Sequence, residues 1–190
     1  MKPRAVFDCM VFLQGAARPA GPARACFRLV DEDRVTLCVS AEILGEVRDV
    51  LTRPKTLRKF PLLSPEWVKA FLQNVESKAL VPPAVPRAFT LARDPKDEPY
   101  LDLAIFVRAQ YLVTRDNDLL DLMKDEGFRT RYPGLTILPP EAVLQAVARQ
   151  EHSEAAAGSD PGRTPESLPE QGSNLPAEES AREDERSPEP

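Results

Sequence analysis

The stretch Ala5-Val6-Phe7-Asp8 places an acid directly after a short, continuous run of apolar residues. A run that is apolar at every position, without alternation, is typical of a strand covered on both faces, as in a parallel sheet. Three further runs of this kind lie at 35–39, 111–113 and 135–138. Because ligands bind at the strand ends and helix starts of such a sheet, Asp8 is a candidate for the functional site.

Helical patterns separate the apolar runs, at 23–30, 41–51, 66–75, 98–109, 118–124 and 141–148. Ser64-Pro65 supplies an N-cap and a first-turn proline before the pattern at 66–75. The pattern at 98–109 is nearly apolar all round, so it is expected at the centre of the fold. The alternation of strand and helix predicts an α/β fold with a mainly parallel sheet between helical layers.

By composition the chain divides into a body at 1–149 and a tail at 150–190. Residues 151–190 hold eleven of the 30 acids and three of the 25 Lys and Arg, so the remainder has 19 acids against 22 bases and is mildly basic. The tail is rich in Pro, Glu, Ser and Gly and lacks aromatic residues, which predicts disorder. It is interpreted as a solvating extension, with a mimic of nucleic acid or a partner-binding segment as alternatives.

Several classes of protein are excluded by what the sequence lacks. There is no apolar run of about 18 residues, as a membrane span requires, and no signal-peptide core, so a cytoplasmic protein without a membrane is expected. Cys9, Cys26 and Cys38 are widely spaced and odd in number, which argues against a disulfide framework or a zinc site. The one histidine, His152, lies in the tail, so histidine base catalysis in the body is not expected.

Four acids lie at the ends of predicted elements and are expected to form a carboxylate pocket: Asp8, Glu46, Asp97 and Asp116. On the helix at 41–51, about 100° per residue places Glu46 at the border of the apolar face, and Ser40 is the expected N-cap. Asp97 lies in line with Leu101 and Ala104, four and seven residues further on, and therefore points inward.

The segment 114–120 follows the third predicted strand directly. Asp116 is its first acid and is favoured as a ligand. Asp118 is expected to cap the following helix and to serve as an occasional ligand. Thr114 and Asn117 are expected to orient these acids by hydrogen bonds.

A cluster of carboxylates raises the pKa values of its members unless a cation offsets the repulsion. Because the ligands are all oxygen atoms, the expected ion is Mg²⁺ or Mn²⁺ rather than zinc. With no histidine base and no nucleophile pair, the chemistry that remains is attack of metal-activated water on a phosphate.

With these residues the chain resembles PIN-domain proteins, metal-dependent ribonucleases that include many bacterial toxins of toxin-antitoxin systems. The resemblance spans residues 5–146 and rests on four segments in order: Val6-Phe7-Asp8, Ser40-Ala41-Glu42-Ile43-Leu44-Gly45-Glu46-Val47, Arg93-Asp94-Pro95-Lys96-Asp97 and Val113-Thr114-Arg115-Asp116-Asn117-Asp118. It implies a three-layer α/β/α sandwich with a mainly parallel central sheet. It also implies that Asp8, Glu46, Asp97 and Asp116 carry the metal site.

The function that the resemblance implies is a Mg²⁺- or Mn²⁺-dependent endoribonuclease, as the toxin of a type II toxin-antitoxin pair. The chain departs from the family pattern at Met10, where the family usually has an Asn. Loss of an amide that holds an acid in place typically weakens metal affinity or activity about 10- to 100-fold. The alternative is therefore a PIN scaffold with a weakened site that binds RNA or a protein. A haloacid-dehalogenase-like phosphatase would need Asp at position 10.

The expected partners follow from the same hypothesis. RNA is the substrate, and the basic residues beside the acids, Arg93, Lys96 and Arg115, are candidates for contacts with its phosphates. A small antitoxin protein would occupy the acidic pocket. Self-association through the helical arm around Trp67 and Phe71 is a further expectation.

Overall fold

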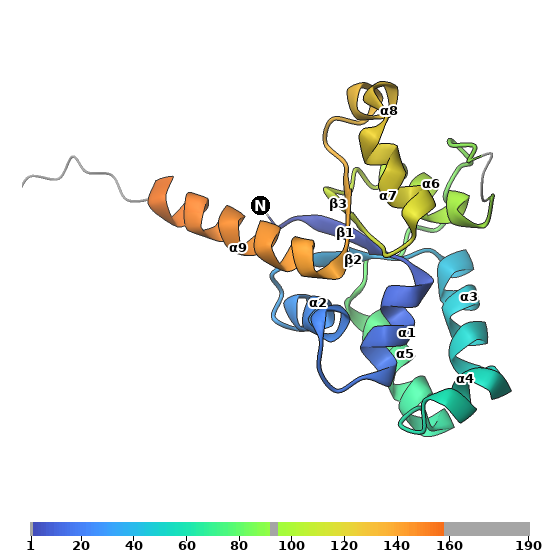
Figure 1. Cartoon of the computed structure of the whole chain (residues 1–190). Helices are drawn as coiled ribbons and strands as arrows, with labels where there is room; N and C mark the ends of the chain where they lie inside the picture. Colours follow the sequence, from blue (N-terminus) through green and yellow to red (C-terminus); the bar gives the residue numbers. More distant parts are fainter. Residues whose placement is uncertain (1, 92–94, 158–190) are drawn as a thin grey trace, which may run out of the picture.

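The computed structural model describes residues 2–91 and 95–157 of the chain (Figure 1). Arg93 and Asp94, and residues 158–190 of the predicted tail, lie outside the described residues. In the described part, a sheet of four parallel strands has the order β2-β1-β3-β4, with bounds β1 Arg4–Phe7, β2 Thr36–Cys38, β3 Tyr111–Val113 and β4 Thr136–Leu138. The predicted α/β fold with a parallel sheet is confirmed.

The strands form where the sequence is continuously apolar because helices cover both faces of the sheet. Val6 in β1 and Leu112 in β3 are fully buried, and Phe7 is 1% exposed. Leu80 extends the sheet beyond β2, since its amide donates to the Leu37 carbonyl at 2.8 Å. The core of the protein therefore lies along the two central strands.

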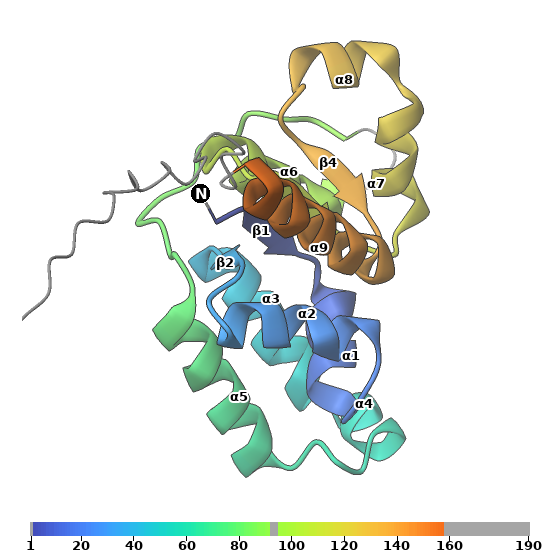
Figure 2. The same ribbon diagram turned by 90° about the vertical axis from the view of Figure 1, so that its left-hand side faces the viewer.

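Helices connect the strands in chain order: α1 Cys9–Ala17, α2 Pro22–Asp31, α3 Ala41–Thr52, α4 Pro54–Lys59, α5 Pro65–Lys78, α6 Glu98–Phe106, α7 Asn117–Asp121, α8 Glu126–Arg131 and α9 Pro140–Ala157, with short 3₁₀ turns η1 Pro95–Asp97 and η2 Leu122–Lys124. α6 packs against β1 and β3, while α9 packs against β3 and α2. Figures 1 and 2 together show helices on both sides of the sheet. The arrangement is the expected three-layer α/β/α sandwich.

The sequence did not predict α1, α4 or α8. α1 is apolar on most of its surface, so it lacks the polar face that marks an amphipathic helix. α4 and α8 span six residues each, which is under two turns and too short for a period of 3.6 to be recognised. Pro54, two residues after the end of α3, is the first residue of α4.

A chain of aromatic rings joins the helices of the lower layer to β1. The ring of Phe27 lies 5.3 Å from each of Phe7 and Phe12 and 5.1 Å from Phe71, measured between centroids and in edge-on geometries. Such pairs stabilise a core by about 0.5–1.5 kcal/mol beyond the area that they bury. Gly15 on α1 makes this packing possible, because a Cβ at that position would overlap the Phe27 ring.

The aromatic packing corrects one expectation about self-association. Phe71 is 4% exposed and belongs to the core, so it is not available to a second copy of the chain. Trp67, in the first turn of α5, is 41% exposed. Of the two residues expected at that surface, only Trp67 lies on it.

The last helix extends past the predicted start of the tail. α9 continues to Ala157 rather than ending near Arg149, and Glu151 on it forms an ion pair with Arg34 at 2.6 Å. The first residues of the segment predicted to be disordered are therefore helical. None of the helices in the described residues has the length and apolar character needed to cross a membrane.

We expect Gly15→Ala to lower the free energy of unfolding by about 1–3 kcal/mol, because the added methyl group overlaps a ring held on three sides by other rings. Gly45→Ala is the matched control, since Gly45 is an exposed residue of α3 with nothing within 4 Å of a Cβ. It should raise stability by about 0.4–1 kcal/mol. Urea denaturation measures both, and a Gly15→Ala protein as stable as the parent would contradict the packing.

Candidate metal and nucleic-acid site

The strand order creates a switch point between β1 and β3. The chain leaves β1 for β2 on one side, whereas β3 lies on the other side of β1. In open α/β sheets, ligands bind beyond the carboxyl ends of the strands at such a point. Asp8 and Thr114 directly follow β1 and β3, and the Asp8 amide donates to the Val113 carbonyl at 3.0 Å.

Asp8 is a buried acid, 5% exposed, and is the N-cap of α1. Its Oδ1 accepts a hydrogen bond from the Val11 amide at 2.7 Å. Its Oδ2 accepts from the Thr114 hydroxyl and, at 3.4 Å, from the Arg115 amide. Burial raises the pKa of Asp8 and the nearby charge of Asp116 adds to the rise, although these hydrogen bonds oppose it.

Thr114 links Asp8 to Asp116. The Thr114 hydroxyl donates to Asp8 and accepts from the Asp116 amide at 2.9 Å, so the single group fixes both sides of the loop. Thr114 is fully buried. The Asp116 carboxylate is exposed and accepts from the Asp118 amide at 2.8 Å.

The expected cap of the helix after β3 is wrong by two residues. α7 begins at Asn117 and Asp116 is its N-cap, whereas the sequence indicated Asp118. The reason is the extended backbone of Asp116, with φ −73° and ψ 127°, which makes it the last residue outside the helix. Asp118 lies in the first turn, and within the described residues Asn117 makes no side-chain hydrogen bond to either acid.

Glu46 lies on α3, which begins at the buried N-cap Ser40, whose hydroxyl accepts from the Ile43 amide at 3.2 Å. The Glu46 carboxylate is on the surface of α3 and accepts a hydrogen bond of 2.6 Å from the Tyr100 hydroxyl on α6. Burial, and then the bond to Glu46, raise the pKa of Tyr100. Tyr100 is therefore a permanent donor that orients this acid.

Cys9 is close enough to both Glu46 and Asp8 for their charges to act on its thiol. Burial raises the pKa of its thiol to about 12, and the charges of Glu46 and Asp8 add to the effect. The thiol stays protonated at neutral pH, which excludes it as a nucleophile.

Asp97 ends η1 and occupies the N-cap position of α6, but its side chain makes no capping hydrogen bond. Its Oδ2 atom is shielded from solvent. Lys96, beside it, is exposed. Arg93, a predicted RNA contact, falls outside the described residues, as does Asp94.

A cavity of about 520 Å³ adjoins Glu46, the one candidate acid in its described lining, which also includes Glu42, Arg87, Phe89, Lys96 and Glu98. Asp102, which is 1% exposed, holds one wall in place because its carboxylate accepts from the amides of Ala88 and Phe89, each at 2.8 Å. Asp102 is not among the site residues predicted from the sequence. Its position on a nearly apolar central helix could have identified it, because a buried acid needs hydrogen-bond partners.

The four acids do not meet in one closed cluster. In residues 2–91 and 95–157, no group of three or more His, Cys, Asp or Glu side chains is arranged to hold a metal ion. The Asp116 carboxylate is turned toward the Asp118 amide, and that of Glu46 toward Tyr100. The donor set is nevertheless all oxygen, which suits Mg²⁺ or Mn²⁺, and Asp8 retains lone pairs for a cation beside its hydrogen bonds.

Arg115 fastens the loop after β3 to the last helix. Its guanidinium donates to both oxygens of Glu141, at 3.1 and 2.8 Å, and to Gln14 at 3.3 Å. Glu141 has a lowered pKa because it accepts a backbone hydrogen bond and, to a lesser extent, because of Arg115. A phosphate at Arg115 would have to compete with this carboxylate.

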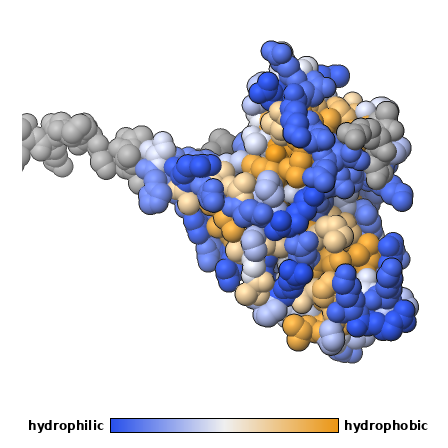
Figure 3. Space-filling model, viewed as in Figure 1, coloured by the Kyte–Doolittle hydropathy of each residue, from blue (hydrophilic) through white to orange (hydrophobic). Residues whose placement is uncertain are grey.

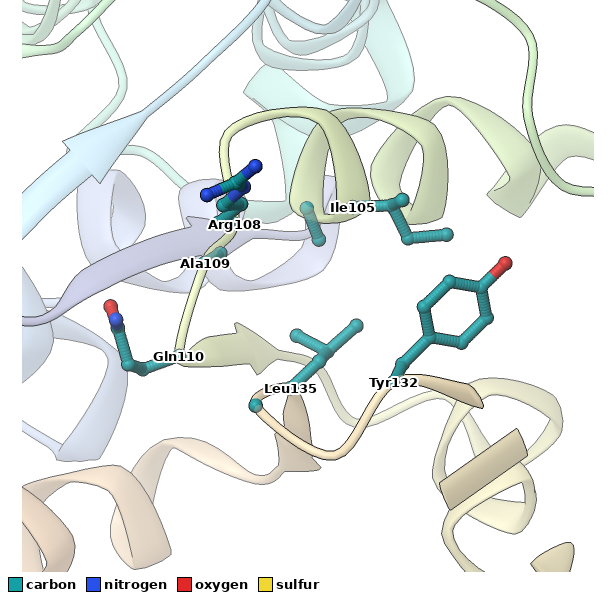
Figure 4. A pocket seen from close by; sticks show the side chains of 8 residues that line it. Ile105, Arg108, Ala109, Gln110, Tyr132 and Leu135 are labelled. Atoms are coloured by element: carbon teal, nitrogen blue, oxygen red, sulfur yellow. The ribbon is translucent and has the colours of Figure 1, made fainter. Parts of the chain in front are cut away.

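A second cavity lies at the opposite edge of the sheet. It has a volume of about 290 Å³ and is lined by residues that precede β3 and β4, among them Gln110 and Leu135. Figure 4 shows Ile105, Leu135 and Tyr132 around a common space. No acid of residues 2–91 and 95–157 lines it, so within that part of the chain it does not extend the carboxylate site.

Comparison with known proteins gives one family. A family model described as "PIN domain" matches residues 4–118, which include the strands β1 to β3 and the four acids. No curated protein matches the chain. PIN domains are typically nucleases that use divalent metal ions. With more than half of its length matched, the chain belongs to the PIN-domain family.

Proposed function

We propose that the chain is a Mg²⁺- or Mn²⁺-dependent endoribonuclease that hydrolyses RNA phosphodiester bonds. The observation that supports the proposal is the environment of Asp8. This acid lies at the β1/β3 switch point, is 5% exposed and has a raised pKa. Among the described residues, no Lys or Arg side chain forms an ion pair with it. A buried carboxylate needs a cation to be ionised at low cost. A divalent ion provides that cation in a nuclease.

Four acids would hold the ion: Asp8, Glu46, Asp97 and Asp116. Thr114 keeps Asp8 in position through its hydroxyl, and Tyr100 does the same for Glu46 at 2.6 Å. When bound, a divalent ion supplies charge to offset the phosphate and lowers the pKa of water. The Tyr100 hydroxyl occupies Oε2 of Glu46 and the Asp118 amide occupies Oδ1 of Asp116, which leaves the other oxygen of each carboxylate for an ion.

The attacking group is water, because the nearby side chains are unsuited to the task. Cys9 and Tyr100 both have raised pKa values and remain protonated at neutral pH. His152 lies on α9, past the body of the protein. We assign phosphate binding near the cavity to Lys96, with Arg93 and Arg115 as further candidates.

A second candidate function is a scaffold with a weakened site that binds RNA or a protein. Met10 favours it, because this residue stands two positions after Asp8, in the first turn of α1, and is 50% exposed. A methionine there offers no amide to hold an acid or a metal-bound water. Cleavage assays separate the two functions.

The role of toxin in a type II pair is part of the same proposal. A small antitoxin with a basic side chain would enter the 520 Å³ cavity, which three acids line. A neighbouring gene for a protein of under about a hundred residues that co-purifies with this chain would support the role.

We expect the purified protein to cut a single-stranded RNA of mixed sequence with Mn²⁺ or Mg²⁺ and not with EDTA. Asp8→Asn and Glu46→Gln should each reduce the rate about 100-fold or more, because even partners of metal ligands typically contribute 10- to 100-fold. Asp49→Asn is the matched control on α3: it removes one exposed acid that pairs with Arg53, and should leave the rate unchanged.

Well-folded protein that cuts no RNA at any concentration of either ion would contradict the nuclease and favour the scaffold. Equal losses in Asp49→Asn and Glu46→Gln would contradict the assignment of Glu46, since they would point to a general effect of charge on α3.

Asp8 should make the metal-free protein less stable as pH rises. Its pKa is raised in the folded state, so its contribution to stability is fully present below the pKa of the unfolded chain and is lost as pH rises through the folded-state pKa. Asp8→Asn has no such loss and keeps an acceptor for the Val11 amide. The melting temperature of the mutant relative to the parent should therefore increase with pH in EDTA; a constant difference would show that the pKa is not raised.

Tyr100→Phe tests the orientation of Glu46. Removal of the hydroxyl should raise the Mn²⁺ concentration for half-maximal cleavage about 10-fold, with a smaller change in the rate at saturating metal. Tyr132→Phe, which changes a tyrosine of the opposite cavity, is the control. If the metal dependence of Tyr100→Phe were unchanged, the hydrogen bond from Tyr100 to Glu46 would have no role in metal binding.

A further inference from the structure

A pocket of about 430 Å³ lies at the end of the molecule away from the carboxylate edge, lined by Ala16, Arg18, Pro19, Arg24, Leu62 and Trp67. It is formed where α1 ends and where the α4–α5 loop meets α5, at the lower end of Figure 1. Asp8 begins α1 and Ala16 nearly ends it, so the pocket and Asp8 are separated by about 12 Å along the helix axis. None of the residues assigned to the proposed metal site lines it.

Trp67 presents its ring to this pocket in a fixed position. Its indole Nε1 donates to the Ala16 carbonyl at 3.0 Å, and its own amide donates to the N-cap Ser64 at 3.1 Å. The side chain is still 41% exposed. A large aromatic ring that is held by a hydrogen bond and left partly open to solvent is a ready platform for stacking.

The charged side chains that line this pocket, Arg18 and Arg24, are both positive. Residues 9–30 and 54–65 supply the pocket's walls apart from Trp67, and neither segment contains an acid; their bases are Arg18, Arg24, Arg28, Lys55, Arg58 and Lys59. In the described part of the chain, the arginines in ion pairs with acids are Arg34, Arg48, Arg53, Arg87 and Arg115, and Arg18 and Arg24 are not among them. Arg24 is near enough to Asp31 to help lower its pKa.

The surface at this end of the molecule has both apolar and hydrophilic side chains. At the lower end of the molecule, Figure 3 shows apolar side chains in orange bordered by hydrophilic ones in blue. Because Arg18 and Arg24 line the pocket together with Leu62 and Trp67, it combines positive charge with apolar contact, as proteins that bind single-stranded nucleic acids do. Glu66, the first acid after residue 50, lies in the first turn of α5 and hydrogen-bonds with Ser64.

We infer that this pocket is a second contact for single-stranded RNA, with a base stacked on Trp67 and phosphates held by Arg18 and Arg24. The inference rests on the proposed function, since it places part of the substrate of that same nuclease. A strand of a few nucleotides would run along α1 from the pocket to the carboxylate edge. An arginine can bind the phosphate of a nucleotide while a neighbouring exposed aromatic ring stacks on its base.

A second copy of the chain fits the pocket less well. A two-fold contact would bring Arg18 and Arg24 toward their own counterparts, and like charges at such an interface cost free energy. An acidic protein segment would match the charge but would have no base to stack on the indole. These two occupants are separate outcomes of the experiment below.

Fluorescence gives a direct test, because Trp67 is the only tryptophan in the chain. The full-length protein in EDTA, which prevents cleavage, is titrated with single-stranded RNA of about ten nucleotides, within the range of site sizes for such proteins. We expect saturable quenching. Trp67→Leu, followed by anisotropy of a labelled RNA, should weaken binding about 10- to 100-fold, while Trp67→Phe should retain most of it.

The double substitution Arg18→Ala/Arg24→Ala should weaken binding and reduce the slope of log K against log salt by about 1.4, the value for two contacts to single-stranded phosphates. Arg129→Ala is the matched control, since Arg129 is an exposed arginine of α8, at the top of Figure 1. Thermal melting of each variant identifies any that fails to fold; if Trp67→Leu fails, the quenching of Trp67 in the parent protein carries the test of stacking.

The outcomes separate this inference from the proposed function. If the protein cuts RNA, but RNA does not quench Trp67 and the arginine variants bind RNA as the parent does, the pocket is not an RNA contact. The proposed nuclease activity would then still stand. Quenching in a protein that never cuts RNA would support the pocket and contradict the nuclease. Equal quenching by a polyglutamate peptide, or a dimer in sedimentation that Trp67→Leu dissolves, would assign the pocket to a protein and overturn the inference.

Discussion

The hydrogen bond between Thr114 and Asp8 joins the carboxyl ends of the two central strands, and the rest of the site is arranged around it. It keeps a buried carboxylate in place at the point where the strand order reverses. The same hydroxyl accepts from the Asp116 amide, so the loop that begins α7 is positioned by the residue that orients Asp8. One buried threonine therefore couples the fold of the sheet to the geometry of two candidate ligands.

This arrangement costs stability in the metal-free protein. Burial raises the pKa of Asp8 above its usual range, and the charge of Asp116 raises it further. Unpaired charge of this kind is typical of functional sites, where groups needed for activity lower the stability of the fold. The aromatic packing of Phe27 with Phe7, Phe12 and Phe71 lies directly beneath, in a part of the core that carries none of the candidate ligands, and can offset part of the cost.

The sequence predicted the strands, the parallel sheet and the family, because continuous apolar runs and helical periods are local signals. It predicted the N-caps Ser40 and Ser64 correctly. It missed α1, because a helix that is apolar nearly all round has no polar face, and it placed the cap of α7 at Asp118 instead of Asp116, because the two acids are equivalent as caps until the backbone is known. It also could not foresee that Tyr100 holds Glu46, or that Glu141 pairs with Arg115, because these partners are 54 and 26 residues apart. Contacts of this kind depend on packing between elements.

The most direct test of the central claim, that Asp8 is a carboxylate placed to hold a divalent ion, is calorimetric titration of the purified protein with Mn²⁺ at neutral pH, without RNA. The account predicts saturable binding to the parent, none to Asp8→Asn, and binding weakened about 10- to 100-fold in Thr114→Val, which keeps the carboxylate and removes the group that orients it. Equal affinity of all three proteins for Mn²⁺ would contradict it.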